Sequence, residues 1–310
     1  MNQKKSTYKV ILTVMVLLVS FHVKAQQDPQ YTQYMYNMMS VNPAYAGSVG
    51  TLEIVGLHRS QWVGFDGAPQ TENIGIHSPL RNEKVGLGLN IINDNLGPSN
   101  ETYFDGNFSY TIKLNYNTQL AFGLKAGGKI LNLDWSKGIY KDPDDVVYNQ
   151  NVKNRFNPLI GAGMFLYADK WYVGFSIPDF INDEYYDDVA EGVNAEQMHY
   201  YLTGGYVFDL SYSLKLKPAV FMKYVAGAPL AVDLSANFLI NDMITLGASY
   251  RFDDSVSGLA GFQLTQSFFV GYAYDYTTTD FNKYNSGTHE IVLRFQLSKK
   301  TKKIQSPRFF

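Results

Sequence analysis

The main pattern in this 310-residue chain is an alternation of apolar with polar or small residues. It is clearest in four stretches, 214–224, 230–240, 244–252 and 291–297. A period of two is typical of a β-strand with one apolar face. Because a soluble sandwich produces the same alternation, the period alone does not distinguish a core-facing sheet from a lipid-facing one.

The connections between these stretches do distinguish them. Brief turns alternate with connections that are often longer, such as 59–69, 135–157, 179–197 and 277–287, although those near Gly227 and Asp253 are short. An even number of strands, with short turns at one end and long loops at the other, is typical of bacterial outer-membrane barrels. The sequence therefore predicts an all-β fold, a transmembrane outer-membrane β-barrel of about 14 antiparallel strands over residues 51–298. We expect strands to begin near Leu52, Glu72, Val85, Thr102, Gln119, Pro158, Trp171, Met198, Ser213, Leu230, Met243, Val256, Phe268 and Thr288.

A membrane barrel also has to close. Backbone groups that face lipid cannot bind water, so we expect the first strand, near Leu52, to pair with the last, near Ile291. The turns and both termini are then expected in the periplasm and the long loops outside the cell. A barrel of fourteen strands is wider than an eight-stranded barrel, which side chains fill, so its lumen is open, plugged or occupied. Glycines on polar faces leave room inside it or relieve crowding in curved strands, as at Gly86, Gly88, Gly247 and Gly271.

Composition excludes several classes of protein. The chain is 15% aromatic, with 24 Tyr, and only 17% charged. After the first 25 residues no stretch approaches the ~20 consecutive apolar residues of a membrane helix, whereas aromatic girdles would account for the tyrosines. The absence of Cys excludes a disulfide framework and a thiolate metal site. A formal net charge of -2 implies no nucleic-acid partner.

The two ends of the chain are expected to lie outside the barrel wall. Residues 1–25 have the positive start, the apolar run from Val10 to Ser20 and the small-residue site before Gln26 that a signal peptide requires. The apolar run is too short to span roughly 30 Å of hydrocarbon as a helix. Residues 299–310 form a basic periplasmic tail, whose lysines suit the membrane surface or an acidic partner. Its last residues, Phe309 and Phe310, are candidates for recognition by a partner.

Residues 26–50 are expected to form an N-terminal periplasmic or plug segment. Tyr31, Tyr34, Met35 and Met38 have the spacing of an amphipathic helix over 31–39, which Asn42-Pro43 would end. This stripe could plug the lumen, pack under the barrel or dock a periplasmic partner. Plugging and packing are favoured because a bare apolar stripe promotes aggregation.

Three motifs carry a resemblance to a known family. They are DPQYTQYMYNMMSVNPAYAGS at 28–48, RSQWVGFDGAPQT at 59–71 and GLGLNIINDNLGP at 86–98. Together they resemble the PorP/SprF family of outer-membrane proteins, which is associated with type IX secretion in Bacteroidetes. The resemblance implies a component that binds, helps export or anchors a large cell-surface protein, such as a gliding adhesin, through its C-terminal domain. It also implies contacts with the translocon and with periplasmic ring or lipoprotein components, and no cofactor.

An alternative function remains open. The same barrel with an open lumen would serve as a diffusion channel or a hydrophobic-solute transporter. Two roles also remain open for the loop 59–69, because its aromatic residues could fold onto the barrel rim or anchor another protein. The candidate partner-binding residues are Tyr31, Tyr34, Met35, Met38, Asn42, Pro43, Tyr45, Gln61, Trp62, Phe65, Phe309 and Phe310.

Catalytic and metal sites are not expected. The acidic stretches 141–145 and 182–192 are oxygen-rich, as calcium prefers, but lack EF-hand spacing, and a solvated loop surface is the simpler interpretation. His58 with Ser60 and His77 with Ser78 are the close His–Ser pairs. Because neighbouring strand residues point to opposite faces, we expect neither pair to form a catalytic motif, and we predict no enzyme activity.

Overall fold

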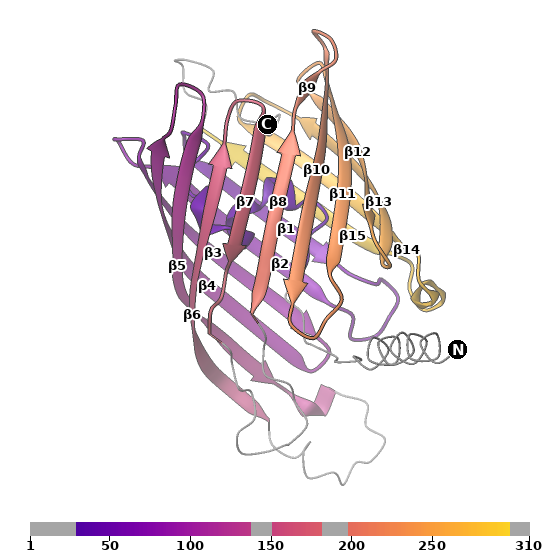
Figure 1. Ribbon diagram of the computed structural model, residues 1–310. Coiled ribbons are helices and arrows are strands. Elements are labelled where there is room, and N and C mark those ends of the chain that lie inside the picture. Colours follow the sequence, from indigo (N-terminus) through magenta and orange to yellow (C-terminus); the bar gives the residue numbers. More distant parts are fainter. Residues whose placement is uncertain (1–28, 138–150, 182–197, 298–310) are drawn as a thin grey trace, which may run out of the picture.

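The computed structural model describes residues 29–137, 151–181 and 198–297 (Figure 1). These residues form a single antiparallel sheet that closes on itself. The strands are β1 (Glu53–Ser60), β2 (Gln70–Pro79), β3 (Val85–Leu96), β4 (Ser99–Lys113), β5 (Gln119–Leu133), β6 (Val152–Tyr167), β7 (Trp171–Ile177), β8 (His199–Tyr206), β9 (Phe208–Asp209), β10 (Leu214–Val225), β11 (Ala231–Ile240), β12 (Ile244–Arg251), β13 (Ser255–Gln263), β14 (Phe268–Thr277) and β15 (Thr288–Gln296).

The sheet has fourteen spans. The sheet contains fifteen strands, but β8 and β9 are consecutive parts of one span. They are separated only at Val207, and both pair with β10. The predicted seam is confirmed, because β1 pairs with β15 from Glu53↔Gln296 to Ser60↔His289. Every predicted strand is present, although β4 and β6 begin several residues earlier than expected, at Ser99 and Val152.

The two ends of the barrel differ. At one end, here called the turn end, the strands are joined by the brief connections 80–84, 114–118, 168–170, 210–213, 241–243 and 264–267. The opposite loop end carries the longer connections, among them 61–69 and 278–287, together with short ones such as Gly97-Pro98. β4, β5 and β6 are the longest strands, and they extend the wall at the loop end (Figure 1). The acidic stretches 141–145 and 182–192 lie outside the described residues.

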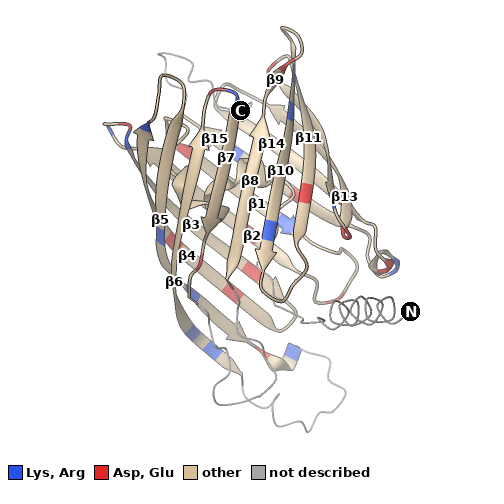
Figure 2. Cartoon of the chain, in the orientation of Figure 1, with Lys and Arg blue, Asp and Glu red and all other residues tan. Residues whose placement is uncertain are grey.

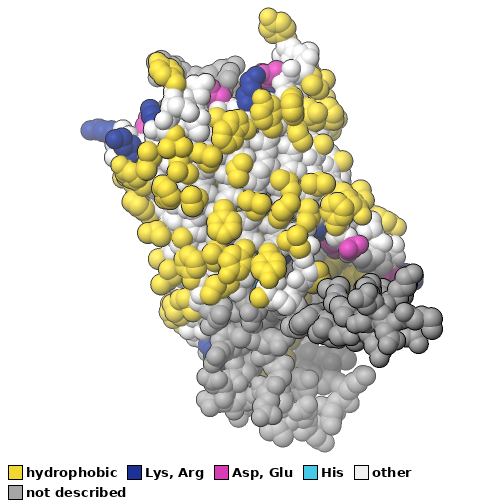
Figure 3. Space-filling model, in the orientation of Figure 1, with side chains coloured by type: hydrophobic (Ala, Val, Ile, Leu, Met, Phe, Trp, Pro, Cys, Tyr) yellow, Lys and Arg dark blue, Asp and Glu magenta, His cyan; other side chains and the backbone are white. Residues whose placement is uncertain are grey.

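The wall is apolar outside and polar inside. Outward positions carry exposed Ile, Leu, Val, Phe and Tyr, which form a belt on the face shown in Figure 3. Charged residues lie at the strand ends and at isolated positions along the strands (Figure 2). The buried ones are Glu53, Arg59, Asp105, Lys125, Lys129, Lys217, Lys223, Asp233, Arg251, Asp275, Glu290 and Arg294. This distribution matches a wall between lipid and a polar lumen.

Three helical turns lie inside the barrel, η1 (Tyr34–Tyr36), α2 (Met38–Val41) and η2 (Pro43–Tyr45). Short 3-10 turns η3 (Trp135–Lys137) and η5 (Asp280–Lys283) belong to the loop end. Within the described ranges, no helix has the length and apolar character needed to cross a membrane. The predicted continuous helix over 31–39 is wrong, because the backbone leaves helical geometry at Asn37, with φ -123° and ψ 41°.

Candidate functional site

The N-terminal segment fills the lumen and forms a plug, residues 29–50. Every residue from Tyr31 to Ala46 is buried. Thr32 contacts β14 and β15 near the loop end, whereas Gly47 contacts His77 near the turn end of β2. The plug therefore runs through the barrel from the loop end to the turn end. A lumen closed on all sides explains why the segment is not a one-sided helix, since each of its faces meets the wall.

Aromatic contacts hold the middle of the plug. The ring of Tyr34 lies 4.9 Å from that of Phe221, and Tyr36 stacks on Phe269 at 4.6 Å. Tyr45 meets the edge of Phe165 at 5.5 Å. These wall residues are apolar at inward positions, where a water-filled barrel would carry polar ones. The wall and the plug therefore share one hydrophobic core.

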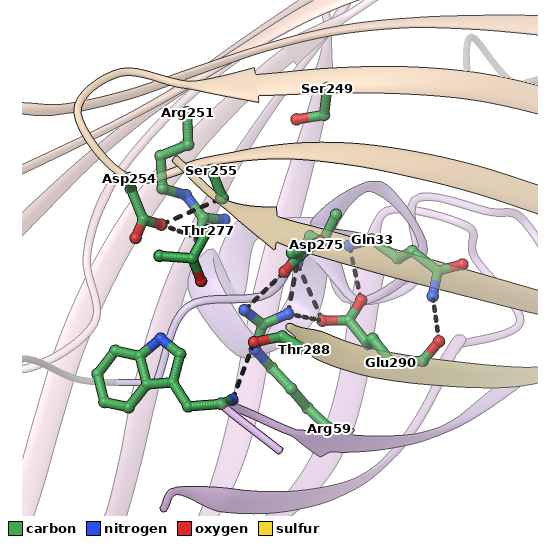
Figure 4. A network of polar contacts seen from close by, with 12 residues as sticks. Gln33, Arg59, Ser249, Arg251, Asp254, Ser255, Asp275, Thr277, Thr288 and Glu290 are labelled. Atoms are coloured by element: carbon green, nitrogen blue, oxygen red, sulfur yellow. Dashed lines mark hydrogen bonds and ion pairs between the residues drawn. The ribbon is translucent and has the colours of Figure 1, made fainter. Parts of the chain in front are cut away.

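A group of charged residues, here called the latch, holds the loop-side end of the plug (Figure 4). The Glu290 carboxylate accepts the backbone N–H groups of Thr32 and Gln33, at 3.0 and 2.7 Å. The Thr32 hydroxyl donates to Asp275 at 2.7 Å. The Arg59 guanidinium bridges both acids, at 2.9 Å from Glu290 and 2.9 Å from Asp275. Charge-assisted bonds of this kind are about twice as strong as neutral ones.

The latch is dry. The side chains of Arg59 and Asp275 are each 4% exposed, and that of Glu290 is fully buried. Removing one member of such a group leaves the others charged and without compensation. The latch thus fixes the plug to both sides of the β1–β15 seam.

The second half of the plug, from Ser40 onward, is held through its backbone. The Ser176 hydroxyl donates to the Val41 carbonyl at 2.6 Å, and Lys125 Nζ donates to the Ser40 carbonyl at 2.9 Å. Asn42 donates from Nδ2 to the Met164 carbonyl and accepts from the Ala44 N–H, each at 3.0 Å. Asn42 therefore caps η2 and ties the plug to β6 with the same side chain.

Wall glycines make room for this backbone. A Cβ at Gly123 would lie 2.1 Å from Ala44 N, and one at Gly86 would lie 2.1 Å from Ala46 O. At Gly271 a Cβ would meet Gln33 Oε1 at 2.4 Å. Gly88 likewise faces the plug, whereas Gly247 lies against Asn237 of the neighbouring strand. Most of the predicted glycines therefore leave room for a resident segment of this chain.

An aromatic rim, Trp62, Phe65, Phe281 and Tyr284, lies at the loop end above the latch. The Phe281 ring is 4.9 Å from Trp62 and 5.4 Å from Phe65. Backbone bonds between Val63 and the 286–287 backbone join the two loops, and Trp62 N donates to the Thr288 hydroxyl at 3.1 Å. Trp62 therefore folds onto the rim, while Phe65 and Tyr284 are 45% and 67% exposed. The role of the loop as an anchor for another protein stays a prediction.

The structure separates the candidate partner-binding residues into three groups. Tyr31, Tyr34, Met35, Met38, Asn42, Pro43 and Tyr45 are enclosed in the lumen, and in this state they present no outer surface. Gln61, Trp62 and Phe65 lie at the rim, where Gln61 N donates to the Pro69 carbonyl within the loop. Phe309 and Phe310 lie outside the described residues, as do residues 1–25, which are predicted to be a signal peptide.

Both chain ends were expected at the turn end of the barrel, but the described plug begins on the loop side. Pro29 borders a cavity that Tyr103 and Asp179 also line, on the loop side of the plug. β15, by contrast, ends at the turn end. The two ends of the described chain therefore lie at opposite ends of the barrel.

The expectation for the histidine pairs needs one correction. His77 is buried inside the wall, beside Glu53 at 3.1 Å, and Ser78 follows on the opposite face. His58 and Ser60, however, are two residues apart and share the outer face of β1, where His58 Nε2 lies 3.1 Å from Ser60 Oγ. In a strand, only adjacent residues point to opposite faces, and residues two positions apart share a face. The expectation that the two side chains point to opposite faces was therefore wrong for His58 and Ser60. In the parts of the chain that the structure describes, no group of His, Asp and Glu has the arrangement of a metal site.

The closed sheet, the apolar belt and the polar lumen filled by its own N-terminal segment define an integral outer-membrane β-barrel with a plug. A family model described as "Type IX secretion system membrane protein PorP/SprF" matches residues 23–295, and the chain belongs to this family. The resemblance seen in the sequence is confirmed. No curated protein matches the chain.

Several solved outer-membrane proteins are similar in structure at low sequence identity. The Acinetobacter baumannii outer membrane protein Omp33 is 10% identical, over 80% of this chain and 98% of that one, with a TM-score of 0.47. The CymD monoaromatic hydrocarbon channel is 12% identical, over 88% and 94%, with a TM-score of 0.49. The KdgM porin is 9% identical, over 79% and 99%, with a TM-score of 0.36.

Proposed function

We propose that this protein receives a large secreted protein at the loop end of the barrel and binds its C-terminal domain, so that the cargo is exported or anchored. Membership of the type IX secretion family supports a role in secretion. The observation that carries the proposal is the aromatic rim, whose Phe65 and Tyr284 side chains are exposed on two loops that backbone hydrogen bonds join. Preformed aromatic anchors contribute most of the binding energy in many interfaces.

The orientation follows the usual rule for such barrels. The loop end then faces the outside of the cell, and the turn end faces the periplasm. The other secretion components, a translocon and periplasmic ring or lipoprotein parts, would meet the turn end and the tail 299–310. The secretion role calls for no cofactor and no catalytic step.

The test is recovery of the cargo from native outer membranes in mild detergent. Phe65→Ser with Tyr284→Ser should lower recovery about tenfold or more, because two exposed anchors are lost. The matched control is Tyr116→Ser with Tyr212→Ser, since these tyrosines are fully exposed at turn-end tips, at 105% and 109%. Equal recovery from both double variants would contradict a cargo site at the rim.

The alternative function, a diffusion channel, requires an open lumen. The hydrophobic core shared by the wall and the plug favours a closed barrel. We therefore expect the full-length protein to be electrically silent in planar bilayers. Steady, large openings would instead support the channel.

A further inference from the structure

Three side chains on the outer face of the barrel have the arrangement of a nucleophile, a base and an orienting acid. Ser60 Oγ lies 3.1 Å from His58 Nε2, and His58 Nδ1 lies 3.6 Å from Glu72 Oε1. His58 and Glu72 are direct register partners on β1 and β2, so the backbone fixes their proximity. The acid is itself oriented by Asn93, whose Nδ2 lies 3.5 Å from Glu72 Oε2. A longer base–acid distance is common before substrate binds.

This group lies where apolar wall gives way to polar rim. Toward the turn end, outward positions of β2 and of the neighbouring β3 carry Ile74 and Ile91, which are 61% and 53% exposed. Toward the loop end, the outward positions of β1 and β2 carry Ser60, the last residue of β1, and Gln70, its register partner. The side chains of His58 and Glu72 are 47% and 58% exposed. A half-exposed carboxylate is unfavourable in hydrocarbon, so we assign this level to the membrane interface, where the ester groups of lipids lie.

A groove leads from His58 and Glu72 into the apolar belt. It has a volume of about 360 Å³, and His58 and Glu72 line it together with Gly56, Ile74, Ile291 and Leu293. Gly56 forms its floor, since a Cβ built there would meet no atom within 4 Å. Its side walls are aliphatic, and His58 and Glu72 form its polar end. Ser60 does not line the groove but follows His58 by two residues on the same face of β1. Lipid chains pack against any barrel, but here one chain position ends beside the histidine and the acid that face this serine.

We propose that Ser60, His58 and Glu72 hydrolyse a carboxylic ester of a long-chain lipid, whose acyl chain lies in the groove over Gly56. Ser60 Oγ bonds to the ester carbonyl carbon while His58 Nε2 takes its proton. The carbon–oxygen bond to the alcohol then breaks, and the leaving oxygen takes that proton from His58. Water from the interface attacks the acyl-serine and gives its proton to His58, which returns it to Ser60 as the fatty acid leaves. Glu72 is a positioning residue that orients the imidazole.

Two register partners of Ser60 complete the site. Gln70 and His289 pair with Ser60 from either side, and cross-strand partners share a face. His289 is held by the Tyr272 hydroxyl, 2.6 Å from its Nδ1. Side-chain N–H groups at these two positions would stabilise the negative oxygen of the intermediate. The proposal is separate from the secretion role and does not rest on it.

The first experiment uses the purified full-length barrel in detergent with a fluorophosphonate probe that labels activated serines. We expect one label, located at Ser60 by peptide mass spectrometry, and no label in Ser60→Ala or His58→Ala. Heat-dependent mobility on gels would show that each variant is folded. A wild-type barrel that stays unlabelled, or a label on another serine, would overturn the proposal.

The second experiment measures phospholipid hydrolysis in mixed micelles. Ser60→Ala should lower turnover at least about a hundredfold, and Glu72→Gln should lower kcat with little change in KM, with partial recovery in Glu72→Asp. Gly56→Leu should fill the groove and impair long-chain esters more than short-chain ones. The matched control is Gly258→Leu, because Gly258 also has open space around its Cβ position. Turnover that persists in Ser60→Ala would overturn the proposal.

Discussion

The latch predicts a strong and specific effect of Arg59→Met. The substitution keeps much of the side-chain volume but removes the guanidinium that bridges Asp275 and Glu290 at 2.9 Å each. Breaking a buried pair by removing one partner costs about 3–5 kcal/mol, because the remaining charges are buried without compensation. Withdrawal of the plug would let water reach both carboxylates and so relieve this cost. The equilibrium for plug opening should then rise by about two to three and a half orders of magnitude.

Cysteine accessibility measures this opening directly. The chain has no native Cys, so Met35→Cys provides a single thiol at a position that is 1% exposed. A maleimide should react slowly with it in the otherwise unchanged barrel and much faster when Arg59→Met is added. Lys215→Met is the control, since Lys215 pairs with Asp242 at 2.8 Å at the turn end, outside the latch. Equal reactivity in the Arg59→Met and control barrels would show that the latch does not hold the plug.

Two further predictions concern the wall. Gly123→Ala should lower the thermal stability of the barrel, because the new Cβ would lie 2.1 Å from Ala44 N, whereas Gly106→Ala should be nearly neutral because its nearest neighbour is 3.8 Å away. Thermal unfolding of both variants in the same detergent checks this, and equal melting temperatures would contradict it. Lys170→Ala should change the free energy of unfolding by less than about 1 kcal/mol, because its pair with Asp209 is about half exposed. A larger loss in denaturant unfolding would contradict that expectation.

The barrel was predictable from sequence because its strands and connections have patterns that short stretches of the chain contain. Alternation and connection length predicted the strands, and the requirement for no open edge predicted the pairing of β1 with β15. The burial of the stripe around Tyr34 was also predictable, since exposure would be unfavourable. The broken geometry at Asn37 was not, because helical periodicity contains no information about a lumen that contacts every face of the segment.

The latch could not be predicted in the same way. Thr32 and Glu290 are 258 positions apart, and only closure of the sheet brings them together. One signal was available: Phe165, Phe221 and Phe269 are large apolar residues at inward positions of strands, and such positions indicate that something packs inside. The Ser60–His58 pair was visible in sequence as two residues of one strand face.

The position of the latch also constrains the order of folding. Arg59 belongs to the first strand to be synthesised, while Asp275 and Glu290 belong to the last two. The plug therefore leaves the ribosome first but cannot be fixed until the final hairpin is in place. Pairings between such distant segments form slowly because the intervening chain must first be ordered. Closure of the seam and locking of the plug are thus a single late step, and a chain that lacks its last strand would have neither a closed wall nor a bound plug.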